Sequence, residues 1–362
     1  MEAMMAKDII FCADGTWNGP GKDLEGHMVD TDSTNVLKLY QWLSGSDTQE
    51  SIKYAGEAER QLFDANGNLL QVAKYLDGVG YNDNWLVKAL GGVFGAGVIA
   101  RIVRGYTFIS RNYEPGDRIF LVGFSRGAYT ARSLAGLILD MGLLDARRDK
   151  LDDKQNAYRL GCAVWNQHRE HFKTKPHHVN LLGEVEALLI DLPGFFSAAP
   201  RHAALLTEIP IQCVAVWDTV GALGIPQYEQ RDVRIDAFQF CDNTLSPRVK
   251  RGLHAVSRDE QRADFTPALW DRAPNVVQAL FGGAHADVGG GYPAAESRLS
   301  DVGLKWMQNQ LKDDIKFGVR PDDLAPDPSA QGHKPWEDPP FKYLAKARRD
   351  FSARPDVDPN PA

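Results

Sequence analysis

The sequence predicts an α/β fold, a three-layer sandwich in which helices cover both faces of a mainly parallel central sheet. Short segments that are apolar throughout recur along the chain, and each one stops abruptly at glycine or aspartate. Continuous apolar runs of this kind are typical of strands that are buried on both faces. Helical patterns separate the runs, and strands that alternate with helices favour a parallel sheet.

Four apolar segments are the clearest candidates for central strands. The first, Ile9–Ala13, runs into the polar turn residues Asp14 and Gly15, as expected where a buried strand opens into a loop. The remaining three end in the same way, and they are Arg118–Val122, Gln212–Trp217 and Asn275–Phe281. Helices are expected between the strands, over Asn84–Tyr113 and Ala128–Met141.

A single domain is expected over residues 7–320, with one insertion and one tail. Asp145–Pro210 has helix-like patterning, mainly over Leu151–Phe172 and Leu181–Ile190, and lies between two predicted strands. We therefore expect a helical cap over residues 145–210. Residues 321–362 are crowded with proline and aspartate, which favours an irregular tail, with its last ten residues disordered.

Composition excludes several classes of protein. With 362 residues, of which 43% are hydrophobic, the chain is long enough to bury a large core. Its net charge of −7 and scattered Lys and Arg residues give no footprint for nucleic acid. The four cysteines are far apart and form no CxxC pair, so neither zinc nor a disulfide framework is indicated.

The termini and apolar tracts indicate a protein made in the cytoplasm. Met1–Lys7 lacks the apolar stretch of a secretory signal, and the tract Ala89–Ala100 is too short to span a bilayer. No transmembrane segment is therefore expected. Export by a machine that needs no signal peptide would leave no trace of this kind in the sequence.

The segment Gly123–Gly127 contains the strongest catalytic motif, G-x-S-x-G, centred on Ser125. It follows a predicted strand and opens a predicted helix, which is the context that a nucleophile elbow requires. Small residues two positions on either side let the chain make the tight turn, and the helix N-terminus favours a developing oxyanion. The alternative is an ordinary strand-to-helix connection in which Ser125 only caps the helix.

A serine hydroxyl needs a base, and the base needs an orienting carboxylate. His285 is the preferred base because it follows a predicted strand in a glycine-dense loop, with His254 as the reserve candidate. Asp218 is the preferred acid because it ends a predicted strand, and Asp287 is the alternative, which could instead brace its loop. The order Ser125, Asp218, His285 is that of an α/β-hydrolase.

Two backbone donors are expected to form an oxyanion hole. One is the N–H of Arg126, which follows the nucleophile, and the second is expected from Gly15 or Thr16. Asp14 precedes them and is a candidate for supporting the substrate or the loop, with an Asx-type structural turn or a metal ligand as alternatives. No metal or other cofactor is required by this chemistry.

Four segments together resemble a known family: Ala13–Asn18, Gly123–Ala128, Val216–Gly221 and Ala284–Tyr292. They look like the DUF2235 family of α/β-hydrolase domains, whose best-described members are the Tle1-type phospholipase effectors of type VI secretion systems. The resemblance spans about Lys7 to Lys305. It implies a catalytic triad of Ser125, Asp218 and His285, activity on ester bonds such as those of phospholipids, and a secretion-system or immunity-protein partner.

The leading functional prediction is a serine esterase, as a phospholipase or lipase, in which Ser125 forms an acyl-enzyme. One alternative is the same chemistry on small soluble esters, thioesters or amides, because a fold fixes the chemistry of a site better than its substrate. Another is a non-catalytic hydrolase-like domain that binds a partner protein.

Overall fold

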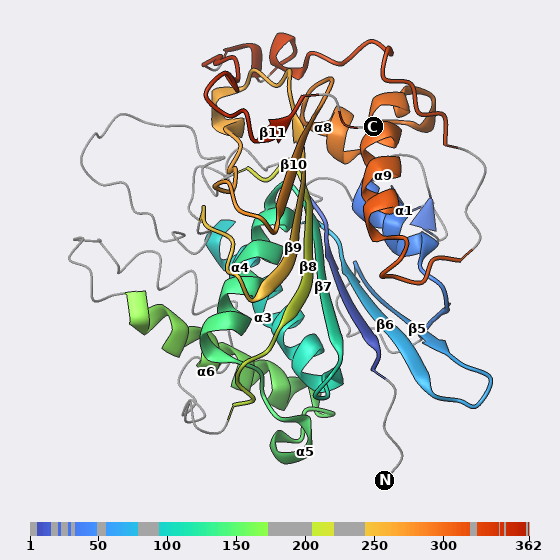
Figure 1. The fold of residues 1–362 in the computed structure, drawn as a ribbon, viewed down its shortest axis with the longest axis vertical. Coiled ribbons are helices and arrows are strands. Elements are labelled where there is room, and N and C mark those ends of the chain that lie inside the picture. Colours follow the sequence, from blue (N-terminus) through green and yellow to red (C-terminus); the bar gives the residue numbers. More distant parts are fainter. Residues whose placement is uncertain are drawn as a thin grey trace.

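A computed structural model of the chain shows a nine-stranded sheet between two layers of helices (Figure 1). It describes residues 6–15, 21–22, 28–29, 33–48, 56–78, 94–172, 205–220, 243–318, 324–339, 341–343, 345–359 and 361. The predicted α/β fold class, with a mainly parallel sheet, is confirmed.

The strand order of the sheet is β11-β10-β9-β8-β7-β1-β6-β5-β4. All neighbours from β11 to β6 pair in parallel, and the edge strands β5 and β4 are antiparallel. Along the chain the strands are β1 (Asp8–Ala13), β4 (Ser46–Asp47), β5 (Glu57–Phe63), β6 (Leu69–Leu76), β7 (Arg118–Phe124), β8 (Ile211–Trp217), β9 (Val249–Ser257), β10 (Val276–Phe281) and β11 (Val357–Asp358). A separate two-stranded pair is formed by β2 (Gly21–Lys22) and β3 (Met28–Val29).

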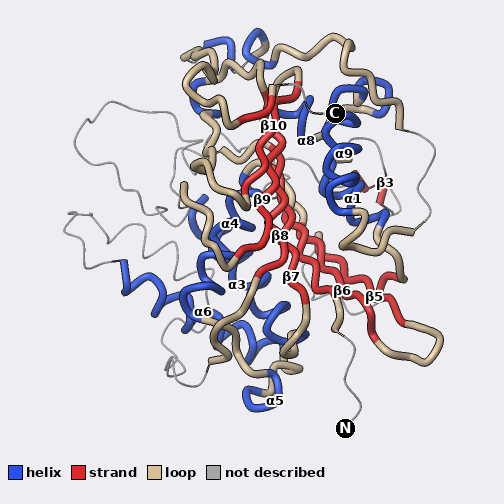
Figure 2. The backbone as a smooth tube through the Cα atoms, in the orientation of Figure 1, coloured by secondary structure: helices blue, strands red, loops and turns tan. Residues whose placement is uncertain are grey.

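Two hydrophobic cores lie on opposite faces of the sheet. One contains side chains of α3 (Phe94–Asn112), α4 (Arg126–Met141) and α6 (Lys154–Phe172). The other contains side chains of α1 (Asn35–Trp42) and α9 (Arg298–Leu311), and Figure 2 shows the red strands running between the two groups of blue helices. Strand β1 illustrates the pattern, because Ile9 and Phe11 enter the first core whereas Ile10 and Cys12 enter the second. This two-sided burial explains the uninterrupted apolar runs in the sequence.

The remaining helices in the described ranges are short. They are α5 (Ala146–Asp149), α8 (His285–Gly289) and four 3₁₀ turns, at Ala263–Phe265, Ala294–Glu296, Pro335–Glu337 and Phe341–Tyr343. No helix in the described part of the chain has the length and hydrophobicity needed to cross a bilayer.

The sheet has a topological switch point at β1. The chain leaves β1 toward α1 on one face of the sheet and leaves β7, its neighbour, toward α4 on the other face. In α/β sheets of this kind, ligands bind in the crevice outside the carboxyl ends of such strands. The loops that follow β1 and β7, at Asp14 and Ser125, are therefore at the position expected for a site.

Two regions of the chain refine the domain prediction. The first helix of the expected cap, α6, lies on α3 and contributes Cys162 and Trp165 to the core, whereas most of the remainder of residues 145–210 lies outside the described residues. Among the described residues of the tail, the regular elements are two 3₁₀ turns, at Pro335–Glu337 and Phe341–Tyr343, and β11. Strand β11 pairs with β10, because Val357 is buried against Val256 and Leu280.

Candidate active site

Ser125 occupies a strained turn between β7 and α4. Its backbone dihedral angles are φ 56° and ψ −122°, in a region that residues with a side chain rarely adopt. Its side chain makes no capping hydrogen bond to the helix, although Ser125 is the N-cap residue of α4. The structure thus gives no support to the alternative in which Ser125 serves only as a cap.

Two glycines make this turn sterically feasible. A Cβ atom on Gly123 would overlap the carbonyl oxygen of Gly127, and a Cβ atom on Gly127 would overlap the carbonyl oxygen of Ala13. Residue 127 must therefore be small for the elbow to lie against the end of β1. The N–H of Ser125 also donates to the carbonyl oxygen of Trp217, at 3.1 Å, which ties the elbow to the end of β8.

Asp218 and His285 are in direct contact. The Nδ1 atom of His285 lies 2.5 Å from Oδ2 of Asp218, and the two side chains are 7% and 0% exposed. Asp218 directly follows β8, and His285 is the first residue of α8, just after β10. The ring of His285 lies beside that of Phe124, with centroids 4.6 Å apart, so His285 borders the residue that precedes Ser125.

The Asp218 carboxylate is held as an anion. Burial opposes its ionisation, but the charge of Arg349 and the hydrogen bonds from His285 and Arg349 outweigh that effect and hold its pKa well below the ordinary value. The N–H of Ser257 donates a further hydrogen bond to Oδ1, at 2.9 Å. Sequence reasoning missed both Ser257 and Arg349.

The surroundings of His285 favour its neutral form. Burial lowers the pKa of His285, although the hydrogen bond and charge of Asp218 act in the opposite direction. Its backbone N–H donates to Oε2 of the buried Glu260, at 3.1 Å, and Glu260 is paired with Arg262 at 2.8 Å. The ring of Phe265 meets that of His285 edge-on, with centroids 5.0 Å apart, and shields it. Sequence reasoning missed Glu260, because β9, the strand that precedes it, was not itself predicted.

Asp14 lies at the end of β1 and is buried. Its Oδ2 atom accepts hydrogen bonds of 2.6 Å from the hydroxyls of Thr34 and Tyr75. Burial raises its pKa to about 7, despite these bonds and that from Gly15. Within the described ranges, no group of three or more His, Cys, Asp or Glu side chains is arranged to hold a metal ion.

Gly15 lies against Ser125. A Cβ atom on Gly15 would be 3.2 Å from that of Ser125 and 3.0 Å from Cδ1 of Phe124. Its N–H donates to Oδ1 of Asp14, at 2.6 Å, in this structure. Thr16, the other candidate for this side of the oxyanion hole, lies outside the described residues. Arg126 is the first residue of α4, so its N–H lies at the N-terminus of that helix. Burial lowers the pKa of its side chain to about 10.

Asp287 and His254, the reserve candidates, have other partners. Asp287 accepts hydrogen bonds from the N–H of Ala284 at 2.8 Å and from Nδ1 of His333 at 2.6 Å. His254 is fully buried, with Nε2 accepting from the N–H of Thr219 at 3.1 Å and Nδ1 facing Gln278 at 3.3 Å. Asp287 thus braces its loop, and His254 supports the loop that carries Asp218.

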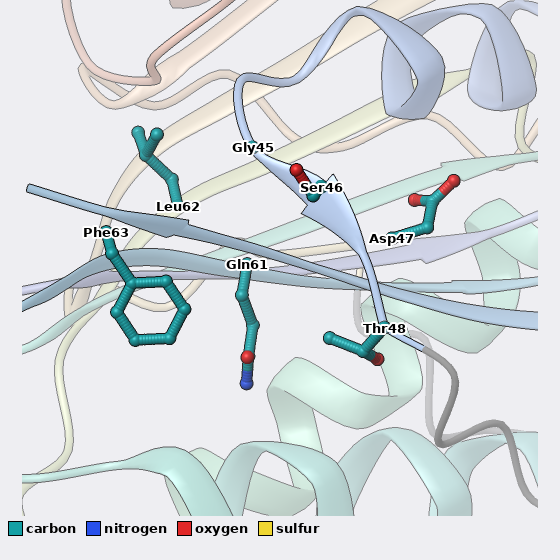
Figure 3. A pocket seen from close by; sticks show the side chains of 7 residues that line it. All are labelled: Gly45, Ser46, Asp47, Thr48, Gln61, Leu62 and Phe63. Carbon is teal, nitrogen blue, oxygen red and sulfur yellow. The ribbon is translucent and has the colours of Figure 1, made fainter. Parts of the chain in front are cut away.

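A hollow elsewhere on the surface contains none of these residues. It lies at the antiparallel edge of the sheet, between residues 45–48 and 61–63 of β4, β5 and their flanks (Figure 3).

Comparison with known proteins identifies the family. Over 87% of this chain, a yeast protein is 37% identical, the uncharacterized protein YEL023C of Saccharomyces cerevisiae. A crystal structure of an uncharacterized protein from Pseudomonas aeruginosa covers 87% of the chain at 17% identity with a TM-score of 0.44. A structure of the Tle1 effector bound to the VgrG spike of the type 6 secretion system covers 79% at 15% identity with a TM-score of 0.36.

The chain spans 58% of the yeast protein, 47% of the Pseudomonas chain and 51% of the Tle1 effector chain. The model of a protein family described as the T6SS phospholipase effector Tle1-like catalytic domain matches residues 7–310. This match covers most of the sequence and includes Ser125, Asp218 and His285. The chain therefore belongs to the Tle1-like phospholipase effector catalytic domain family.

Proposed function

We propose that this protein is a serine hydrolase of carboxylic esters, with phospholipids as its substrate class. The observation that carries the proposal is the 2.5 Å contact between the buried His285 and Asp218, at the sheet edge where Ser125 occupies its strained turn. Membership of the family supports a lipid ester as the substrate. The same site could act on soluble esters, and the test below separates the two classes.

The proposed mechanism has two half-reactions. Oγ of Ser125 attacks the acyl carbonyl carbon while Nε2 of His285 takes the serine proton, because Nδ1 is occupied by Asp218. The tetrahedral intermediate collapses, the ester C–O bond breaks, and His285 returns the proton to the leaving alcohol. Water then attacks the acyl-enzyme with the same base, which releases the carboxylic acid and restores the serine hydroxyl.

The local electrostatics suit this reaction. A neutral His285 can accept a proton at neutral pH, and an ionised Asp218 stabilises the imidazolium that forms and fixes the tautomer. The N–H of Arg126, at the start of α4, is our first candidate donor to the oxyanion. We place the second donor at Gly15 or Thr16, where Gly15 would have to exchange its present partner, Asp14, for the substrate.

The test is ester hydrolysis by the purified protein and two variants, Ser125→Ala and the control Ser329→Ala, which alters an exposed tail serine. The substrates are p-nitrophenyl esters of short and long acyl chains and phospholipid vesicles, each with and without calcium. We expect turnover to fall by about 10⁴-fold or more in Ser125→Ala and to be unchanged in Ser329→Ala. Equal turnover by the native protein and Ser125→Ala would refute the assignment of the nucleophile. Turnover of soluble esters alone would refute the phospholipid class.

Delivery by a type VI secretion system is a separate proposal, as is a secretion-system or immunity-protein partner. Both the delivery and the partner are proposed from the family description alone. The proposal is that the protein is made in the cytoplasm and exported without a signal peptide. Secretion assays in the native cell, with and without a working secretion apparatus, test it. Equal amounts of protein outside both cells would refute it.

A further inference from the structure

We propose that Arg349, which the tail segment Ala345–Asp350 carries into the active site, positions the acid Asp218. The inference rests on the proposed function, because it assigns a role within the same site. Arg349 is a positioning residue in this account, since it contacts Asp218 and not the reacting atoms. It lies 39 residues beyond residue 310, where the family match ends (349 − 310 = 39).

The guanidinium of Arg349 donates two parallel hydrogen bonds to the carboxylate of Asp218. Nη1 donates to Oδ1 at 2.6 Å, and Nη2 donates to Oδ2 at 3.0 Å. Each nitrogen also donates to a backbone carbonyl, Nη1 to Ser257 at 2.7 Å and Nη2 to Phe265 at 2.5 Å. A planar guanidinium that makes these four hydrogen bonds fixes the plane of the carboxylate. A lysine ammonium cannot reproduce this geometry.

The segment that carries Arg349 is fastened to the chain around the site. The N–H of Ala263 donates to the carbonyl oxygen of Ala345 at 3.1 Å, and the N–H of Ala347 donates to that of Gln261 at 2.8 Å. These bonds flank Arg349 on its N-terminal side, and β11 joins the sheet on its C-terminal side. The side chain of Arg349 is only 5% exposed, so the tail inserts it into the interior.

A buried carboxylate needs compensation for the loss of water. Neutral His285 supplies Asp218 with a single N–H donor, whereas Arg349 supplies a countercharge and two donors. Arg349 thereby keeps Asp218 ionised and turns Oδ2 toward Nδ1 of His285. Around His285, the charge of Arg262 disfavours the protonated form, whereas Asp218 and Glu260 favour it.

The experiment uses the full chain with Arg349→Lys, Arg349→Met and the matched control Arg348→Met, which removes the adjacent, exposed arginine. The first readout is kcat and KM for ester hydrolysis across a pH range. The second is the downfield proton resonance of the His285 Nδ1–H, identified by its loss in His285→Ala. The second readout does not depend on turnover.

For Arg349→Met we expect kcat to fall by about 100-fold with KM nearly unchanged, because the base is misoriented. The acidic limb of kcat/KM should move to higher pH, because loss of a positive charge beside the Asp218–His285 pair favours the protonated form of His285. The resonance should shift as well. Arg349→Lys should keep the limb in place while kcat falls by about tenfold. Arg348→Met should match the native protein in every readout.

Native rates with an unshifted resonance in Arg349→Met would overturn the proposal. A lower rate with an unmoved limb and an unmoved resonance would overturn it too, because that pattern indicates a structural role alone. If Arg349→Met does not fold, Arg349→Lys decides, and a native kcat and resonance in that variant would contradict the positioning role. If the native protein hydrolyses none of the ester substrates, the proposed function fails. The resonance alone then tests whether Arg349 positions Asp218.

Discussion

Nδ1 of His285 lies 2.5 Å from Oδ2 of Asp218, although 67 residues separate the two in the chain. The contact exists because β8 and β10 both end at the same edge of a parallel sheet, with β9 between them. One oxygen of Asp218 thus orients the imidazole, and Ser257 and Arg349 hold the carboxylate. These contacts fix the position of the carboxylate relative to the imidazole.

Replacement of Asp218 by Asn should lower kcat by about 10³–10⁴-fold, because an amide no longer enforces the tautomer of His285 that accepts the serine proton. It should also lower the free energy of unfolding by about 3–5 kcal/mol, since the buried Arg349 loses its countercharge. The control is Asp287→Asn, which should weaken its loop but reduce kcat by less than about tenfold. Near-native turnover by Asp218→Asn, with a large loss in Asp287→Asn, would move the acid role to Asp287.

Gly15→Ala and Gly127→Ala should fail in different ways. The new Cβ at position 15 would be 3.2 Å from that of Ser125, a contact that small shifts can relieve, so we expect a folded protein with kcat/KM reduced by about 10–100-fold. The new Cβ at position 127 would overlap the backbone of Ala13, and we expect a loss of about 3 kcal/mol of stability. Thermal unfolding and ester hydrolysis measure the two effects. Full activity of Gly15→Ala would remove Gly15 from the oxyanion hole.

His254 should make the protein sensitive to acid. Burial and the charge of Arg132 lower its pKa from 6.5 to about 3, so the unfolded chain binds a proton that the folded protein excludes. The contribution of neutral His254 to the free energy of unfolding is complete above pH 6.5. It is lost as the pH falls toward 3, by about 1.4 kcal/mol per pH unit. Urea unfolding of the native protein and of His254→Gln measures the difference. Parallel stability curves for the two proteins between about pH 4 and about pH 7 would contradict the assignment.

His333 should act in the opposite sense. Burial disfavours its charged form, but hydrogen bonds to Asp287 and Glu296 outweigh that effect and raise its pKa above 6.5. The folded protein therefore holds this proton more tightly than the unfolded chain does. Its contribution to stability is complete below pH 6.5 and is lost as the pH rises through the higher folded value. His333→Gln should be less stable than the native protein at acidic pH and closer to it at alkaline pH. An equal difference in stability between the two proteins at acidic and alkaline pH would show that His333 does not titrate as described.

Strands buried on both faces could be predicted from the sequence because their apolar runs are uninterrupted. The four strands predicted in this way are confirmed as β1, β7, β8 and β10. Strand β6 escaped detection because it contains Lys74, which is buried against Glu57 at 2.6 Å and Glu59 at 3.1 Å. Strand β9 was missed because Lys250, Arg251 and the buried His254 interrupt its apolar pattern. Lys74 pairs with charges on the neighbouring strand and Arg251 pairs with Asp314 outside the sheet, and no local pattern reveals such partners.

The candidate site likewise contains residues that the sequence reveals and one that it does not. Ser125, Asp218 and His285 are near strand ends, where periodicity and turn residues point to them. Arg349 is in a proline-rich segment, and its partner Asp218 is 131 residues away. Nothing local marks such a residue, because its role comes only from the path of the folded tail.

The most direct test of the account is to treat the protein with a fluorophosphonate and to locate the adduct by peptide mass spectrometry. We expect one modified residue, Ser125, with labelling slowed by orders of magnitude in His285→Ala and abolished in Ser125→Ala. An unlabelled protein, or an adduct on a different serine that survives Ser125→Ala, would contradict the claim that Ser125 is the nucleophile.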